Sequence, residues 1–217
     1  MSSGFDKVVA LRRLLDERFP PARRRDSRLV PTGVAAVDAA LDGGLLTGTL
    51  TEFVSAAPSA GNQLSLGSVI LVTRAARQRI ALVDAANAFD LETFDDDALA
   101  HVVWVRCPSL DQCWRAADLV ARDPNYTVVA VDVRGFPERA LLRTKDSIWA
   151  RLQRAAEQAE TALVIQTTTP LVPNAARRLV FEAPLTPATL TTPRITVTGS
   201  IQVELQRQRH RTREHAG

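Results

Sequence analysis

Short apolar runs alternate along this chain with segments in which apolar residues recur at helical spacing. The runs include residues 80–84, 102–106, 127–133 and 161–166. Between them, residues such as Leu110, Cys113, Trp114 and Ala117 fall three or four positions apart. A strand that is apolar at successive positions is buried on both faces, and strands separated by helices form parallel sheets. We therefore expect an α/β fold whose mostly parallel central sheet is covered by helices on both faces.

The residues before position 80 add one more strand and a buried helix. Residues 49–55 have the pattern of a strand, residues 55–63 form a loop rich in Ser, Ala, Pro and Gly, and residues 63–77 follow as a helix. Because this helix is apolar nearly all round, it should pack against the sheet. Before the strand, Val34, Val37 and Leu41 mark a short helix, and residues 42–44 mark a turn.

The C-terminal part has a different pattern. Residues 178–182, 194–198 and 200–206 are separated by prolines and by Gly199. This punctuation predicts short antiparallel strands that extend the sheet at its end. A chain of 217 residues is long enough for one sizeable core. We therefore divide it into an N-terminal arm (1–28), a core (29–206) and a tail (207–217).

Charge is concentrated at the two ends. The formal net charge is +3, but residues 1–30 hold eight Lys or Arg against four Asp or Glu, and residues 194–217 hold five against two. The middle, 31–193, is therefore acidic, with a net charge of −4. This distribution argues against a broad nucleic-acid surface on the core. Direct DNA or partner contacts would then come from arginines at the two ends of the chain; the alternative is that these arginines are simply solvated. The arginines are Arg23, Arg24, Arg25, Arg207, Arg209 and Arg211.

The arm also carries an amphipathic pattern. Val8, Leu11, Leu15 and Phe19 lie at helical spacing before two prolines. Such a helix either packs on its own core or docks on another chain. The N-terminus lacks the apolar stretch of a secretory signal, and the apolar runs are shorter than the ~20 residues that span a bilayer. We therefore expect a cytoplasmic protein.

The loop after the first strand lies where parallel sheets bind phosphate. Its common form, G-x-x-x-x-G-K-[ST], places a lysine on the phosphates and a hydroxyl on magnesium. Here Asn62 stands at the lysine position, Gln63 at the hydroxyl position and Ser55 at the first glycine. Both lysines of the chain lie elsewhere in the sequence. This degenerate nucleotide loop offers backbone amides around Ser59 and Gly61 but no cation.

Three segments resemble the RecA ATPase core. They are residues 29–54, residues 82–90, which resemble the segment that carries the catalytic glutamate, and residues 128–132, which resemble the Walker B strand. The resemblance implies a RecA-like P-loop core. It also implies that Ala86 replaces the water-activating glutamate and that Asp132 is the Walker B-like acid. Because the cation, the metal-binding hydroxyl and the general base are all missing, we expect no ATP hydrolysis.

Within this core the chain is more similar to the ImuA family, the RecA-like accessory proteins of bacterial mutagenic translesion synthesis. The N-terminal helical arm, residues 103–107 and the short basic final strand carry this resemblance. It implies a catalytically silent scaffold of the SOS response. Its partners would be an ImuB-like inactive Y-family polymerase homologue, an error-prone DnaE-type polymerase and RecA itself, with weak or indirect DNA contact.

Three alternatives remain open at this stage. The chain could bind nucleotide through backbone amides without cleaving it. It could be a cell-division inhibitor of the SulA kind, which shares a RecA-like core without the loop motif. It could also be a DNA-binding module that acts through its arginine ends.

Other chemistry-bearing residues have structural interpretations. Asp84 and Asp132 end parallel strands at one edge, where they either bind a metal or serve the fold; we predict no metal and no cofactor. The two cysteines, Cys107 and Cys113, are expected to be buried thiols. The three tryptophans should pack in the core, residues 95–97 should begin a helix, and Thr144 should cap the helix that follows it.

Overall fold

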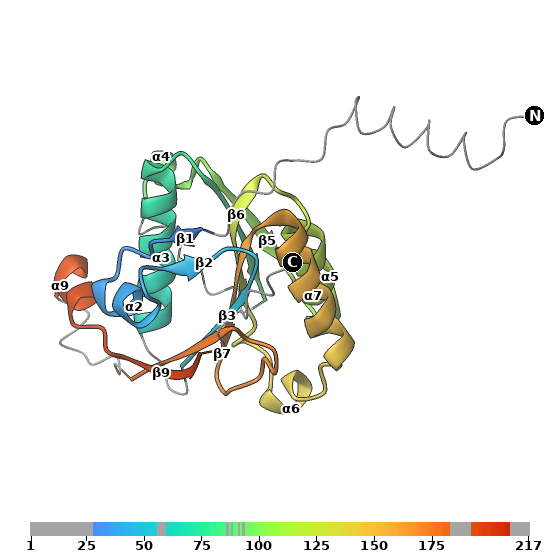
Figure 1. Ribbon diagram of the computed structural model, residues 1–217. Helices are drawn as coiled ribbons and strands as arrows, with labels where there is room; N and C mark the ends of the chain where they lie inside the picture. The colour runs from blue at the N-terminus through green and yellow to red at the C-terminus, as the bar shows by residue number, and fades with distance from the viewer. Residues whose placement is uncertain are drawn as a thin grey trace, which may run out of the picture.

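The computed structural model describes residues 28–55, 60–85, 87, 89–90, 92, 94–182 and 192–208. Seven strands in these residues form one sheet: β3 (Leu50–Val54), β4 (Arg79–Asp84), β5 (Val102–Arg106), β6 (Tyr126–Asp132), β7 (Ala162–Thr167), β8 (Arg177–Phe181) and β9 (Val203–Gln208). Their spatial order is β5-β4-β6-β7-β3-β8-β9. The sheet runs through the middle of the molecule, between the helices (Figure 1). All neighbours are parallel except β8 and β9. The predicted α/β fold with a mostly parallel sheet is confirmed.

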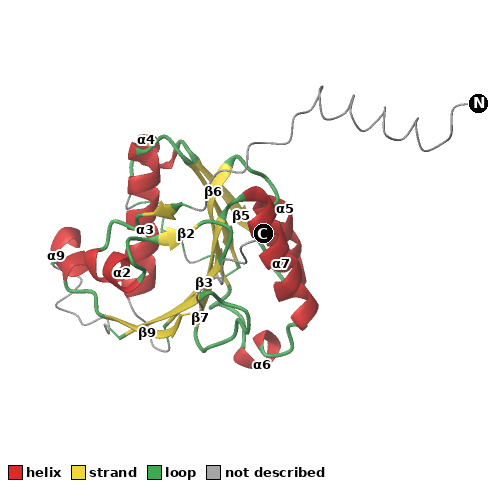
Figure 2. Ribbon diagram, viewed as in Figure 1, coloured by secondary structure: helices red, strands yellow, loops and turns green. Residues whose placement is uncertain are grey.

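Helices cover both faces of this sheet (Figure 2). One face is covered by α5 (Leu110–Ala121) and α7 (Asp146–Ala159), and the other by α2 (Ala35–Ala40) and α3 (Ala60–Ala75). Three further short helices complete the described part: α4 (Asp96–Leu99), α6 (Glu138–Leu141) and α9 (Arg194–Gly199). No helix in the described residues is long and apolar enough to cross a membrane.

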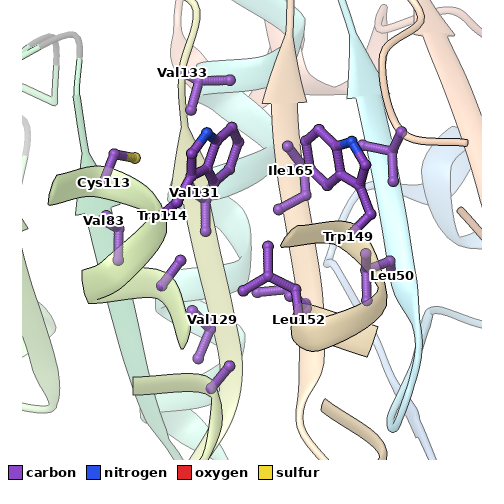
Figure 3. Packing of buried hydrophobic residues seen from close by; sticks show 14 of the residues in the cluster. Leu50, Val83, Cys113, Trp114, Val129, Val131, Val133, Trp149, Leu152 and Ile165 are labelled. Atoms are coloured by element: carbon purple, nitrogen blue, oxygen red, sulfur yellow. The ribbon is translucent and has the colours of Figure 1, made fainter. Parts of the chain in front are cut away.

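The core on the α5 and α7 face is built around two tryptophans. Trp114 of α5 and Trp149 of α7 meet edge to face, with ring centroids 4.9 Å apart and planes at 71° (Figure 3). Val129 and Val131 of β6 point into this core because alternate residues of a strand face the same side. The predicted packing role of these two tryptophans is confirmed. Cys107 and Cys113 are buried free thiols beside them, also as predicted.

The core on the α2 and α3 face takes the other residues of the same strands. Val128 and Ala130 of β6 face this side, and Phe53 of β3 packs edge to face on Phe181 of β8 at 5.1 Å. Each central strand is therefore buried on both faces, which is why its sequence is apolar at successive positions.

The C-terminal elements correct two predictions. First, β8 runs parallel to β3, and the one antiparallel pair in the sheet is β8 with β9. Second, residues 194–199 form helix α9 and not a strand. Residues 195–198 are β-branched, which favours strands locally, but Pro193 precedes the helix and the backbone N–H of Val197 donates to its carbonyl. Val197 is buried in this packing, so tertiary contacts override the local preference.

Two further differences concern the ends of elements. A small antiparallel ladder, β1 (Leu29–Val30) with β2 (Leu45–Leu46), was not predicted. Thr144 does not cap α7: the N-cap residue is Lys145, which makes no side-chain capping bond, and the Thr144 hydroxyl has no partner within the described residues. In contrast, Asp95 caps α4 by accepting a hydrogen bond from the backbone N–H of Ala98, as expected for an acidic helix start.

Candidate functional site

Three polar residues lie side by side at the carboxyl edge of the sheet. Asp84 on β4 is the register partner of Asp132 on β6, which is in turn the partner of Gln166 on β7. On each strand, the residue two positions earlier belongs to the core on the α2 and α3 face, here called the α3-side core. Because alternate residues of a strand face the same side, all three polar residues face α3. All three residues are buried. The prediction that Asp84 and Asp132 end parallel strands at one edge is confirmed, and the two strands are neighbours in the sheet.

Helix α3 begins directly above this edge. Its bounds place Gly61, Asn62 and Gln63 in the first turn of the helix, whereas the sequence had suggested a loop up to residue 63. Asn62 is fully buried, and its side-chain Nδ2 donates to the backbone carbonyl of Phe53 at 3.5 Å. The residue at the lysine position therefore folds back onto β3. Ser55 lies just after β3, where its N–H donates to the carbonyl of Thr167, and Ser59 lies outside the described residues.

Three buried polar atoms between α3 and the sheet have no hydrogen-bond partner in the described part of the chain. They are Oδ1 of Asn62, Oγ of Ser65 and Oε1 of Gln166. Ser65 lies three residues after Asn62, on the same side of the helix, and Nε2 of Gln166 donates to the carbonyl of Asn62 at 3.4 Å. Neutral amide and hydroxyl groups therefore lie beneath the first turn of α3, beside the carboxylates of Asp84 and Asp132.

Asp132 forms an ion pair with Arg134, two residues further along the chain. Its Oδ1 accepts from the Arg134 N–H at 3.1 Å and from Nε at 3.0 Å, and its Oδ2 accepts from Nη2 at 2.6 Å. The two side chains are 4% and 16% exposed. A planar guanidinium that binds both carboxylate oxygens is among the stronger ion pairs in proteins. A magnesium ion at Asp132 would therefore have to displace Arg134.

The Asp84 carboxylate accepts a hydrogen bond from a tryptophan side chain. Its Oδ2 accepts from the indole Nε1 of Trp104 at 3.1 Å and from the backbone N–H of Phe89 at 3.3 Å. Phe89 contacts Trp104 edge to face and stacks on Phe94, while the Arg106 guanidinium lies 4.9 Å from the Trp104 ring centroid. Trp104 is partly buried in the α3-side core, as predicted. These contacts support the structural interpretation of Asp84.

A scan against protein-family models finds no match to this chain, and a search of curated proteins finds none either. In the described residues, no group of three or more His, Cys, Asp or Glu side chains is placed to hold a metal ion.

Sequence reasoning missed Glu52, which is fully buried in β3. Its Oε1 accepts from the Thr167 hydroxyl at 3.1 Å and from the backbone N–H groups of Leu171 at 2.6 Å and Val172 at 3.1 Å. Its Oε2 accepts from Nε of Arg178 at 2.6 Å, and Nη2 of Arg178 donates to the carbonyl of Val172. Glu52 thus fastens the segment after β7 to β3 and β8. An acid inside an apolar strand was the one signal that could have found it.

Most residues of the predicted docking and DNA-contact set lie outside the described residues, as does Ala86. They are Val8, Leu11, Leu15, Phe19, Arg23, Arg24, Arg25, Arg209 and Arg211. Arg207 lies on β9, where its backbone is the register partner of Arg178 of β8. The point at which the arm joins the core is described: Nη2 of Arg28 donates to the Thr127 hydroxyl, and its N–H donates to the Thr47 hydroxyl. Arg28 therefore lies at the start of β6, the sheet edge opposite to α3's first turn.

Proposed function

We propose that this chain is a catalytically silent RecA-like protein that acts as a protein–protein scaffold in mutagenic translesion DNA synthesis in the cytoplasm. The proposal rests on the resemblance of residues 29–54, 82–90 and 128–132 to the RecA core and of the chain to the ImuA family. A mostly parallel sheet with helices on both faces is compatible with it.

The observation that carries the catalytic silence is the ion pair between Asp132 and Arg134. In a phosphoryl-transfer site the acid at this strand end holds magnesium, and the loop lysine neutralises the phosphates. Here the acid is held on both oxygens by Arg134, and the lysine position is a buried Asn62 bonded to β3. Both groups are occupied by contacts within the chain.

Glu52 supports a static core. In RecA the residues that follow the strand corresponding to β7 relay the nucleotide state to a DNA-binding loop. Here two hydrogen bonds hold that segment to one oxygen of the Glu52 carboxylate, from the backbone N–H groups of Leu171 and Val172, and the Thr167 hydroxyl at the end of β7 donates to the same oxygen. Val172 is fully buried. A segment held in this way has little freedom to move in response to a ligand bound at the first turn of α3.

The arm provides the partner contact in this proposal. Arg28, the first described residue, lies at the sheet edge opposite to the first turn of α3, so the arm joins the core at that edge. We expect the ImuB-like protein, the DnaE-type polymerase and RecA to be the proteins recovered with the full chain.

Two measurements test the proposal. The purified chain should show no ATP turnover above background, and turnover that disappears in Asp132→Ala would refute catalytic silence. A chain that begins at Arg28 should keep the melting temperature of the full chain but lose its partners in a pull-down. Unchanged partner recovery would discard the role of the arm.

A second candidate function is nucleotide binding without hydrolysis. The observation that favours it is the 16-residue helix α3, whose N-terminus lies at the carboxyl edge of the sheet, since free amides and the helix dipole attract phosphate there. A rise in melting temperature with ADP or ATP would support this function over a ligand-free scaffold.

A further inference from the structure

The segment after β6 projects a small rigid element from the carboxyl edge of the sheet. It contains α6, which lies below α7 at the bottom of Figure 1. Successive backbone hydrogen bonds run through it: the N–H groups of Ala140 and Leu141 donate to the carbonyl of Pro137, and that of Leu142 donates to Glu138. The turn continues to residue 144. The side chains of this element are therefore held at fixed spacing.

One side of the element anchors it, and the other is exposed. Leu141 is 1% exposed and belongs to the core on the α5 and α7 face, whereas Leu142 is 61% exposed. Arg139 lies three residues before Leu142 and four before Arg143, so the three share one helical side. Both arginines and Lys145 are exposed. None of these three cations takes part in an ion pair within the described part of the chain.

We propose that Arg139, Leu142, Arg143 and Lys145 form a docking surface, the α6 surface, for an acidic peptide segment of a partner protein that carries an apolar anchor side chain. Three unpaired cations within seven residues complement carboxylates, and the exposed Leu142 between two of them offers an apolar contact. Because the backbone is already ordered by its turns, binding would not have to order it. The inference rests on the proposed scaffold function, to which it adds a second contact, at the sheet edge opposite to Arg28.

The surroundings favour a peptide over a nucleic acid. Glu138 and Asp146 flank the cations, and the middle of the chain carries a net charge of −4. A long polyphosphate would therefore be repelled where it extends beyond the α6 surface, whereas a short acidic segment need not extend beyond it. Single strands also bind through exposed aromatic rings. The aromatic residue of this segment, Phe136, is partly buried against the core.

The test measures binding of a short fluorescein-labelled peptide of Asp and Glu with a central Leu-Phe pair to the full chain by fluorescence anisotropy. The double variant Arg139→Glu with Arg143→Glu should weaken binding about fivefold or more, because it replaces two attractions with two repulsions. Leu142→Ser should weaken binding of this peptide but not of a matched peptide in which Ser-Ser replaces Leu-Phe.

The matched control is the double variant Arg77→Glu with Arg79→Glu, which makes the same charge change at exposed positions near the amino edge of the sheet. It should leave peptide affinity within about twofold of wild type. Equal loss in both double variants, no saturable binding, or displacement of the peptide by an equal concentration of a single-stranded oligonucleotide would each overturn the proposal. Failure to recover the partner proteins with the full chain would instead refute the scaffold function, so the two failures are distinguishable.

Discussion

Asp84 and Asp132 are register partners on neighbouring parallel strands, yet their carboxylates serve different parts of the protein. Asp132 binds Arg134 through both oxygens, and Asp84 holds the indole of Trp104 and the backbone N–H of Phe89. Two buried carboxylates on adjacent strands repel one another unless each is stabilised. In this protein each is stabilised by protein donors, so the edge needs no metal ion to keep both acids buried.

Arg134→Ala should lower the free energy of unfolding by about 2–3 kcal/mol, because it leaves the buried Asp132 carboxylate without its guanidinium partner. Urea denaturation followed by circular dichroism measures the loss. The control is Arg122→Ala, which breaks a more exposed pair with Asp118 and should cost less than about 1 kcal/mol. Equal stability of Arg134→Ala and wild type would mean that the pair does not stabilise the edge.

The sequence predicted the central strands because burial on both faces leaves a direct mark on composition. Residues such as Val128 and Val129 face opposite cores, and both had to be apolar. The direction of β8 leaves no such mark, because a strand beside β3 is apolar whether it runs parallel or antiparallel. Residues 195–198 favour a strand by local propensity, and only their packing makes them helical.

Part of the candidate site was predictable from the sequence. Asp84 and Asp132 each end an apolar strand, and the ends of parallel strands meet at one edge of a sheet. The Glu52 network was not predictable, since its four donors come from residues 115 to 126 positions further along the chain. A buried acid signals that a partner must exist, but the fold decides which residue supplies it. Asn62 is similar: its type excluded a phosphate-binding cation, whereas its bond to Phe53 required the structure.

Glu52→Gln should cost about 3 kcal/mol of unfolding free energy, because an amide NH₂ group would face either the Arg178 guanidinium or the backbone N–H groups of Leu171 and Val172. Chemical denaturation gives the value. As a control, Arg115→Ala breaks an exposed pair with Asp111 and should cost less than about 1 kcal/mol. If the two variants lost the same stability, Glu52 would not be the clamp of the segment after β7.

The two core tryptophans should differ in their response to truncation. Trp149→Ala should cost about 3–5 kcal/mol, because it removes a large buried ring and its edge-to-face contact. Trp114→Phe should cost only about 1 kcal/mol. The loss of part of the ring is offset by the removal of a buried indole N–H that has no partner among the described residues. Circular dichroism is the appropriate signal, since both changes alter tryptophan fluorescence. A larger loss for Trp114→Phe than for Trp149→Ala would contradict the packing described here.

His101 should make stability depend on pH near neutrality. Burial, and then the charge of Arg74, lower the pKa of His101 below its ordinary value, and its Nε2 lies 3.0 Å from the Thr73 hydroxyl. The unfolded chain therefore takes up a proton at higher pH than the folded chain does. The contribution of neutral His101 is fully present above about pH 6.5 and is lost as the pH falls below that value. Unfolding free energies at pH 7.5, 6.5 and 5.5 should decline in wild type and decline less in His101→Gln, which keeps a hydrogen-bonding side chain but cannot titrate. The same decline in both proteins would assign the pH dependence to other groups.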